Sequence, residues 1–90
     1  MVAMHMKIFG RVQGVWFRAN TQQAAQRLSL AGWVMNTPDG AVEVHAQGGH
    51  DAVDELLAWC YQGPPGARVD KIDFRQAQVD ESLKGFSIRY

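Results

Sequence analysis

The spacing of hydrophobic residues changes several times along this chain, and these changes limit its possible folds more than any other feature. A period of two is typical of a strand with one buried face, and a period near 3.6 of a helix with one buried face. The first kind of spacing predicts strands at residues 4–9, 33–36, 42–47, 69–79 and 86–90. The second kind predicts a helix from Phe17 to Ala31, and another that begins at His50 or Asp51 and stops before Gly63-Pro64-Pro65-Gly66.

This order, β-α-β-β-α-β with a short terminal strand, predicts the fold class. We expect an α+β fold, the ferredoxin-like split β-α-β sandwich, in which an antiparallel sheet carries two helices on one face. The length of 90 residues is enough for one core and leaves little room for a second. We therefore expect a single domain over residues 1–90.

Local signals supply the expected turns and helix ends. Thr37-Pro38-Asp39-Gly40 combines a proline with an Asp-Gly pair, which predicts a hairpin between two strands. Gly32 is expected to end the first helix as a C-cap, and His50 or Asp51 to cap the second. In the strand at 42–47, alternation predicts Val42, Val44 and Ala46 in the core and Glu43, His45 and Gln47 in solvent.

Three polar features are expected to meet at one end of the sheet. The strands at 4–9 and 33–36 run parallel, because the helix between them returns the chain to its starting side, so both strands finish at the same end. With the strand at 42–47 inserted between them, their ends lie about 10 Å apart. This end then holds the loop from Gly10 to Trp16, Arg18 in the first helical turn, and Asn36.

A loop with two glycines that leads into a helix is suited to binding phosphate. The loop and the helix start offer unpaired N–H groups and the positive end of the helix dipole. Arg18 adds a fork of donors that matches phosphate oxygens. From the loop alone a structural interpretation stays open, in which Gly10 and Gly14 only form a turn and Arg18 is a solvated charge.

Other common site chemistries lack their residues. A nucleotide-binding P-loop needs Lys-Ser or Lys-Thr after its last glycine, where this chain has Val15-Trp16. Cys60 lies on the apolar stripe of the second helix, so we interpret it as a core residue and not as a nucleophile. The three histidines show no metal-ligand spacing, and no serine lies in a nucleophile motif. We expect no metal site.

Charge and cysteine content limit the partners and the compartment. Nine basic and nine acidic residues give a net charge of zero, which argues against sequence-independent binding to nucleic acid or to an anionic membrane. The charges are unevenly placed, since residues 1–38 hold four bases and no acid. A lone cysteine, no signal peptide and no long apolar run predict a cytoplasmic protein. We expect a monomer.

Several segments together resemble the acylphosphatase family. They are Gly10-Arg11-Val12-Gln13-Gly14-Val15-Trp16-Phe17-Arg18, then Gly32-Trp33-Val34-Met35-Asn36, and Asp39-Gly40-Ala41-Val42-Glu43. Gly63-Pro64-Pro65-Gly66-Ala67-Arg68-Val69 and the ending from Phe86 to Tyr90 also resemble that family, so the resemblance covers nearly the whole chain. The fold of that family is the one predicted above.

The resemblance implies hydrolysis of the carboxyl-phosphate bond of a small acyl phosphate to a carboxylate and inorganic phosphate, without metal or cofactor. It implies that Arg18 binds the phosphoryl group and that Asn36 positions the attacking water. The backbone N–H groups of the phosphate-binding loop would come from Arg11, Val12, Gln13, Gly14, Val15, Trp16 and Phe17. Because a carboxylate is a good leaving group, holding the phosphoryl oxygens and aiming water in line are enough for catalysis. The family's proposed proton acceptor is the phosphate of the substrate itself.

Two alternatives are noncatalytic binding modules. A ferredoxin-like RNA reader stacks bases on aromatic residues of its central strands, and the strand at 42–47 has none. A degenerate acylphosphatase-like domain would be expected to lack Arg18 or Asn36, and both are present. The physiological substrate stays open, because acetyl, carbamoyl, glyceroyl and aspartyl phosphates share the reacting group.

Overall fold

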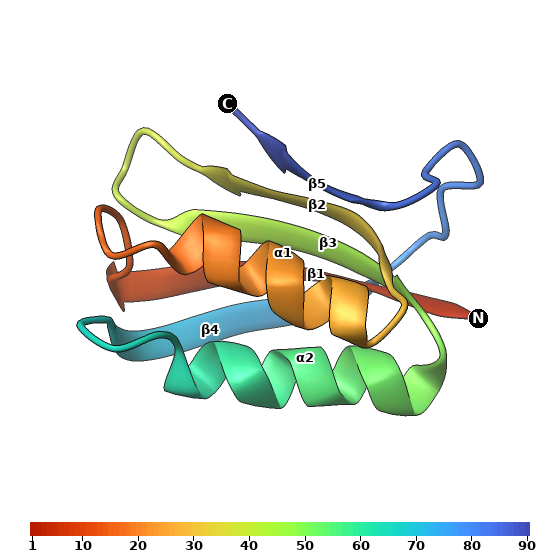
Figure 1. The fold of residues 1–90 in the computed structure, drawn as a ribbon, viewed down its shortest axis with the longest axis horizontal. Helices are drawn as coiled ribbons and strands as arrows, with labels where there is room; N and C mark the ends of the chain where they lie inside the picture. Colours follow the sequence, from red (N-terminus) through yellow and green to blue (C-terminus); the bar gives the residue numbers. More distant parts are fainter.

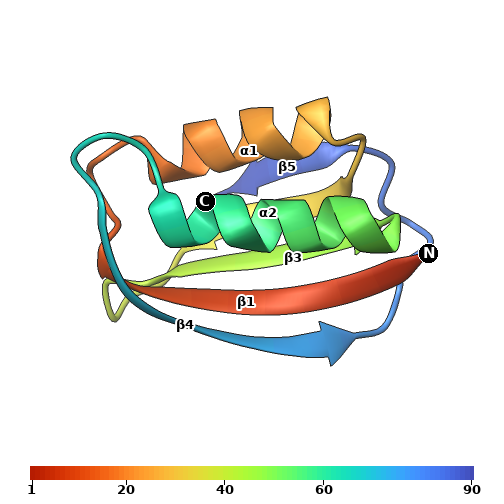
Figure 2. The same cartoon turned by 90° about the horizontal axis from the view of Figure 1, so that it is seen from below.

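The computed structural model, which covers residues 1–90, contains two layers, a five-stranded sheet and a pair of helices on one of its faces (Figures 1 and 2). The elements are β1 (Val2–Arg11), α1 (Phe17–Arg27), β2 (Ala31–Asn36), β3 (Val42–Gly48), α2 (His50–Gln62), β4 (Arg68–Ala77) and β5 (Phe86–Arg89). The predicted fold class is confirmed. Neither helix is long and apolar enough to cross a membrane.

The strand order is β4-β1-β3-β2-β5. β3 lies between β1 and β2 and is antiparallel to both, with Val44 opposite Met6 on one side and Val34 on the other. β1 and β2 are therefore parallel and finish at the same end of the sheet, as predicted. β5 pairs with β2 in parallel, with Ile88 opposite Val34. This is the only parallel pair of neighbouring strands, and it makes the sheet mixed.

Alternating residues of the central strands form the core beneath the helices. Met6, Ile8, Val34, Val42 and Val44 are fully buried on the helix-facing side of the sheet. The helices cover them with apolar residues at helical spacing, which are Phe17, Ala24 and Ala25 from α1 and Val53, Leu56 and Cys60 from α2. The two hydrophobic periods thus meet in one core.

The first helix ends four residues earlier than predicted. Leu28 is its C-cap, and Ser29 adopts a left-handed conformation with φ 57°. The N–H of Leu30 donates to the carbonyl of Ala25, and that of Ser29 to Gln26, which is the Schellman arrangement. Gly32, predicted as the C-cap, is instead inside β2, where it opposes Ala46. The prediction failed because apolar spacing continues past the true helix end.

His45 and Gln47 are buried, although they were predicted to face solvent. Both lie on the sheet face without helices, as their alternation requires, but other residues cover them there. Trp33 stacks on His45 with ring centroids 6.1 Å apart, which leaves His45 9% exposed. Gln47 accepts from the N–H of Asp80 at 2.9 Å and donates to its carbonyl at 2.8 Å, so the segment after β4 covers it.

The other element boundaries lie within a few residues of the predictions. α2 begins at His50, and the N-cap residue is Gly49, so no side chain forms a capping hydrogen bond. The predicted capping by His50 or Asp51 is therefore wrong. The turn 37–40 joins β2 to β3 as predicted, with the N–H of Thr37 bonded to the carbonyl of Ala41.

Ile72 of β4 is buried under α2, whereas Phe74 on the same face is 51% exposed because β4 is an edge strand.

Candidate active site

A pocket of about 280 Å³ lies where β1 and β2 finish and α1 begins. The expected meeting of loop, helix start and strand end therefore takes place. Nine residues line the pocket: Val12, Gly14, Trp16, Phe17, Arg18, Ala19, Asn36, Ile88 and Tyr90. Arg18 is the only charged side chain among them, so the pocket is suited to an anion.

The loop from β1 to α1 presents free N–H groups. Gly14 has φ 76° and Trp16 has φ 64°, so two left-handed residues turn the chain sharply before the helix. None of the turn and loop hydrogen bonds uses an N–H of residues 12 to 16 as its donor. Successive unpaired N–H groups in such a turn form a concave anion site. The left-handed conformation costs Trp16 on the order of 1 kcal/mol, whereas Gly14 adopts it without that penalty.

The first turn of α1 adds to this positive character. Trp16 is the N-cap and provides no side-chain acceptor, and the turn contains no acidic residue. The free N–H groups and the helix dipole are therefore not neutralised within the chain. The carbonyl of Trp16 accepts from both the backbone N–H of Asn20 and its side chain, at 3.1 Å and 2.9 Å, which holds the strained turn in place.

Arg18 is available to a ligand. It lies in the first turn of α1, is partly exposed, and makes neither an ion pair nor a side-chain hydrogen bond with the protein. Its only described partner is the ring of Tyr90, whose centroid lies 5.1 Å from the guanidinium carbon. A cation over a ring face is held in position while its N–H donors stay free at the edge.

The side-chain amide of Asn36 makes no hydrogen bond with the rest of the protein that would explain its position. It is the last residue of β2, and its Oδ1 is buried without a hydrogen-bond partner. An unsatisfied buried polar group is rare and calls for a functional explanation. A half-turn of the amide exchanges the positions of its oxygen and its nitrogen. Asn36 can therefore offer an acceptor or a donor to a molecule in the pocket.

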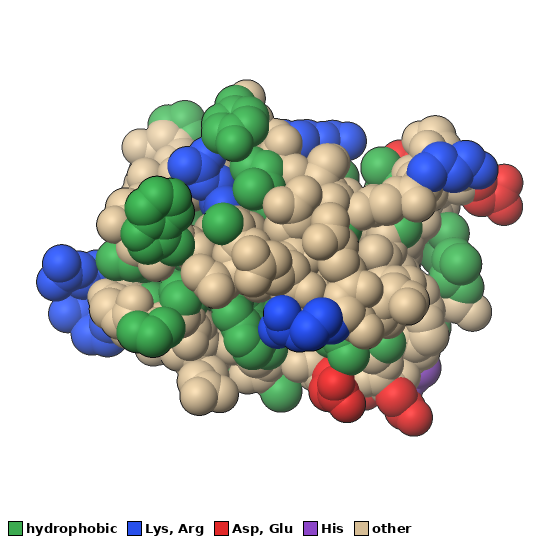
Figure 3. Space-filling view, in the orientation of Figure 1, with side chains coloured by type: hydrophobic (Ala, Val, Ile, Leu, Met, Phe, Trp, Pro, Cys, Tyr) green, Lys and Arg blue, Asp and Glu red, His purple; other side chains and the backbone are tan.

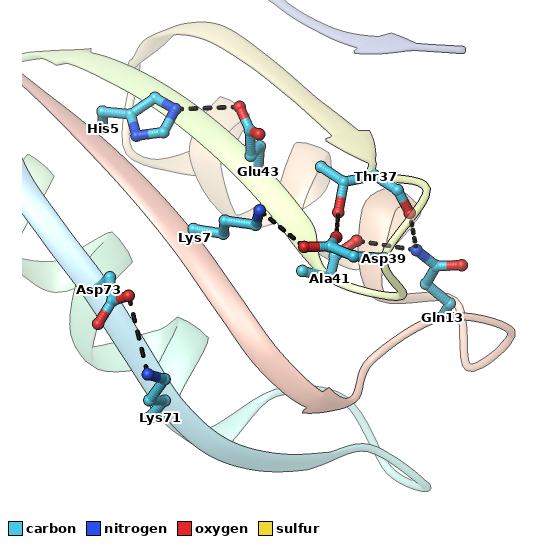
Figure 4. A network of polar contacts seen from close by, with 9 residues as sticks. All are labelled: His5, Lys7, Gln13, Thr37, Asp39, Ala41, Glu43, Lys71 and Asp73. Atoms are coloured by element: carbon cyan, nitrogen blue, oxygen red, sulfur yellow. Dashed lines mark hydrogen bonds and ion pairs between the residues drawn. The ribbon is translucent and has the colours of Figure 1, made fainter.

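Three of the predicted loop residues do not line the pocket. Arg11 is the last residue of β1 and pairs with Arg68 of β4. Val15 packs against the core. The side chain of Gln13 points to the hairpin after β2, where its Nε2 donates to the carbonyl oxygens of Thr37 at 2.8 Å and Ala41 at 2.9 Å (Figure 4).

Ala19, Ile88 and Tyr90 line the pocket but were not identified as site residues from the sequence. Ile88 lies opposite Val34, so continued alternation in the parallel pair brings Tyr90 beside Asn36 on the helix-facing side. The alternation of Phe86, Ile88 and Tyr90 was visible in the sequence. Only the pairing of β5 with β2 shows that this face of β5 reaches the pocket.

Acidic, histidine and cysteine side chains lie outside the pocket. No histidine, cysteine, aspartate or glutamate lines it, and no three such residues are grouped as a metal site requires. Cys60 is fully buried, and burial raises the pKa of its thiol to about 12. Asp39 accepts from the hydroxyl of Thr37 and from Lys7 at 2.9 Å, and these bonds lower the pKa of its carboxyl to about 2.

Comparison with known proteins gives one consistent result. The sequence profile of the family described as Acylphosphatase matches residues 4–88. An acylphosphatase of Methylococcus capsulatus is 48% identical over 88 residues, which are 98% of this chain and 96% of that protein. An acylphosphatase of Gloeobacter violaceus is 52% identical over 97% of this chain and 92% of its own. The crystal structure of acylphosphatase from Bacillus subtilis superposes with a TM-score of 0.95, at 37% identity and full coverage of both chains.

Proposed function

This chain belongs to the acylphosphatase family, and from that membership we propose that Arg18, Asn36 and the loop from Arg11 to Phe17 form its active site. The protein is an acylphosphatase, a hydrolase that converts a small acyl phosphate into a carboxylate and inorganic phosphate. The observation that carries the site assignment is the convergence of a free arginine, a free amide and unpaired N–H groups in one pocket.

The phosphoryl group binds through charge and directed hydrogen bonds. Arg18 donates two parallel hydrogen bonds to its oxygens, and the N–H groups of the loop surround the remaining ones. These donors are already in place before the substrate arrives, so they stabilise the charge of the transition state without further rearrangement. Within the loop, Val12, Gly14, Trp16 and Phe17 supply the pocket-lining part.

Asn36 orients the water that attacks phosphorus. With its amide oxygen turned into the pocket, it accepts a hydrogen bond from the water and aligns the water oxygen in line with the breaking bond. The new bond from water oxygen to phosphorus forms as the bond to the acyl oxygen breaks, and its electron pair leaves with the carboxylate. The pocket lacks a side chain that could take the water proton, so a phosphate oxygen of the substrate accepts it.

The chemistry requires neither a metal ion nor an acid catalyst in this scheme. A carboxylate is a weak base and leaves without prior protonation, and the positive pocket performs the charge stabilisation that a metal would provide. The chain acts as a single domain and a monomer in the cytoplasm, without nucleic acid or membrane as a partner. Its balance of nine basic and nine acidic residues supports the last point.

The assignment is tested by release of inorganic phosphate from acetyl phosphate in the presence of a chelator. We expect Arg18→Ala to lower kcat/KM by about 10²- to 10³-fold, with loss of phosphate binding. Asn36→Ala should lower kcat by a similar factor, about 10²-fold or more, while phosphate still binds. Arg27→Ala, at the far end of the same helix, is the matched control and should keep full activity.

Three results would each contradict a different part of the assignment. Phosphate release at the background rate with the unaltered protein would exclude the activity under these conditions. Full activity in both Arg18→Ala and Asn36→Ala would exclude this pocket as the active site. Loss of activity on adding chelator would contradict the metal-free scheme.

A further inference from the structure

An acidic side chain lies near the pocket, although the pocket is suited to an anion. Seen from the helix side, basic side chains project from the end of the molecule where β1 finishes and α1 begins, and no acidic side chain is visible there (Figure 3). Asp39 belongs to the same end, because it follows closely after Asn36, which lines the pocket. A free carboxylate at this place would weaken phosphate binding, so its presence calls for a role.

The carboxylate of Asp39 closes the hairpin 37–40 and ties it to β1. It accepts hydrogen bonds from the hydroxyl of Thr37 and from the backbone N–H of Ala41, which lie on either side of it in the connection from β2 to β3. Its third donor is the ammonium group of Lys7, whose Nζ lies 2.9 Å from Oδ2 (Figure 4). The bond to Asp39 also raises the pKa of Lys7, so the ammonium group stays charged.

Lys7 bonds to the hairpin although two other acidic residues are closer in the sheet. Glu43 lies opposite Lys7 on β3, and Asp73 lies opposite it on β4. Each of these has another basic partner, since Glu43 bonds to His5 at 3.1 Å and Asp73 pairs with Lys71 at 3.9 Å (Figure 4). Lys7 thus links β1 to a connection that begins beyond β3, 32 positions later in the chain.

Stability alone does not explain this link. The side chain of Asp39 is 54% exposed and that of Lys7 is 31% exposed, and ion pairs so open to solvent contribute little to the free energy of unfolding. The link does fix a position, because it joins an inner strand of the sheet to the connection that continues from Asn36. The amide of Asn36 has no bond of its own to hold it, so its placement depends on the backbone that carries it.

We infer that Lys7 is a positioning residue, which acts through Asp39 to hold Asn36 where it orients the attacking water. The inference rests on the proposed function, because it takes Asn36 to orient that water. An exposed ion pair changes an equilibrium by no more than about fivefold. Without the pair, the hairpin should leave its catalytic position for part of the time, and the loss of kcat should be of the same size.

The test measures hydrolysis of acetyl phosphate by Lys7→Met, which keeps an unbranched side chain and removes its charge. We expect kcat to fall about fivefold. KM should rise by no more than about twofold, because Arg18 and the N–H groups of the loop are unaltered. Lys7→Arg, which still donates to Asp39, should restore most of kcat.

The matched control is Lys71→Met on the neighbouring strand. Both lysines lie over the ring of Phe9, Lys71 at 4.9 Å and Lys7 at 5.5 Å from the centroid. Lys71 pairs with Asp73 and makes no contact with the hairpin, so its variant should keep the kcat of the unaltered protein.

Two double variants test the route of the effect. Lys7→Met should lower kcat no further in an Asp39→Asn background, where the charged partner is gone, nor in an Asn36→Ala background, where the positioned residue is gone. A merely structural role of Lys7 would lower kcat by the same factor in every background. Thermal unfolding should show a Tm for Lys7→Met that is lower by no more than about 5 °C, so the variant is folded in the assay.

The outcomes separate this inference from the proposed function. If Asn36→Ala lowers kcat and Lys7→Met does not, the inference is wrong and the proposed function stands. The inference is also wrong if Lys7→Met lowers kcat equally with and without Asn36. If the unaltered protein does not hydrolyse acetyl phosphate, or if Asn36→Ala keeps full activity, the proposed function itself fails.

Discussion

Gln13 and Thr37 join the two halves of the proposed active site through a hydrogen bond of 2.8 Å from the side-chain amide of Gln13 to the backbone carbonyl of Thr37. Gln13 lies in the loop that presents N–H groups, and Thr37 directly follows Asn36. A second bond of 2.9 Å from the same nitrogen to the carbonyl of Ala41 closes the hairpin (Figure 4). One side chain thus ties the loop from β1 to α1 to the segment that follows Asn36, the residue proposed to orient water.

Gln13→Ala should therefore damage catalysis without removing any group that touches the substrate. We expect kcat to fall about tenfold, and stability to fall by about 1–2 kcal/mol, because two partly buried hydrogen bonds are lost. Steady-state kinetics and urea unfolding measure the two effects. Gln23→Ala, an exposed residue of α1 without a side-chain hydrogen bond, is the control and should show neither. Unchanged kcat in Gln13→Ala would contradict the positioning role.

Asp39 should stabilise the hairpin at neutral pH and lose this effect in acid. Hydrogen bonds from Thr37 and Lys7 lower the pKa of its carboxyl to about 2, below the ordinary value of 3.8. Because the pKa is lower in the folded state, the stabilisation is complete above the ordinary value and disappears as the pH falls to about 2. Thermal unfolding should show Asp39→Asn less stable than the unaltered protein at pH 6, with the gap closing near pH 2.

The matched control for Asp39 is Glu55→Gln on the exposed face of α2, where the glutamate forms no ion pair. Its difference in Tm from the unaltered protein should not vary between pH 6 and pH 2. A gap for Asp39→Asn that stays constant over this range would show that the carboxylate is not the source of the effect.

The thiol of Cys60 should be inert in the folded protein. It is fully buried on the core side of α2, and burial raises the pKa of the thiol to about 12, so the reactive thiolate is absent at neutral pH. We expect a thiol reagent at pH 8 to label unfolded protein at once and native protein only as fast as the core opens. Rapid native labelling, or loss of activity in a Cys60→Ala variant that remains folded, would contradict this placement.

Gly32→Ala should destabilise the protein by more than about 3 kcal/mol. Gly32 has φ 148° inside β2, and an added Cβ would collide with the backbone carbonyl of His45 in the neighbouring strand, which has no room to move. Chemical denaturation measures the loss. Gly85→Ala is the control, because its Cβ would meet open space, and it should stay within about 0.5 kcal/mol. Equal effects at the two positions would refute the steric argument.

The features that are local in the chain were predictable. The hairpin at 37–40 follows from Pro and Asp-Gly turn chemistry, and the strands and helices follow from two hydrophobic periods. The meeting of the loop from β1 to α1, Arg18 and Asn36 was also predictable, because the fold class alone places the ends of β1 and β2 at one end of the sheet.

Features that depend on neighbouring segments were missed. Apolar spacing could not show that α1 ends through Ser29 and not at Gly32, because a Schellman ending is a matter of backbone conformation. Alternation placed His45 on the correct face but could not show that Trp33 covers it. The edge position of β4 likewise leaves Phe74 exposed beside the buried Ile72.

The sequence by itself determined the chemistry that we propose for this protein, since the proposal depends on a glycine-containing loop, one arginine and one asparagine. Only the tertiary structure decided the surroundings of that chemistry. Pairing of β5 with β2 brings Tyr90 over Arg18, and Gln13 reaches across 24 positions of the chain to Thr37. Local conformational preferences act over a few residues, whereas strand pairing and side-chain packing depend on which distant segments the folded chain brings together.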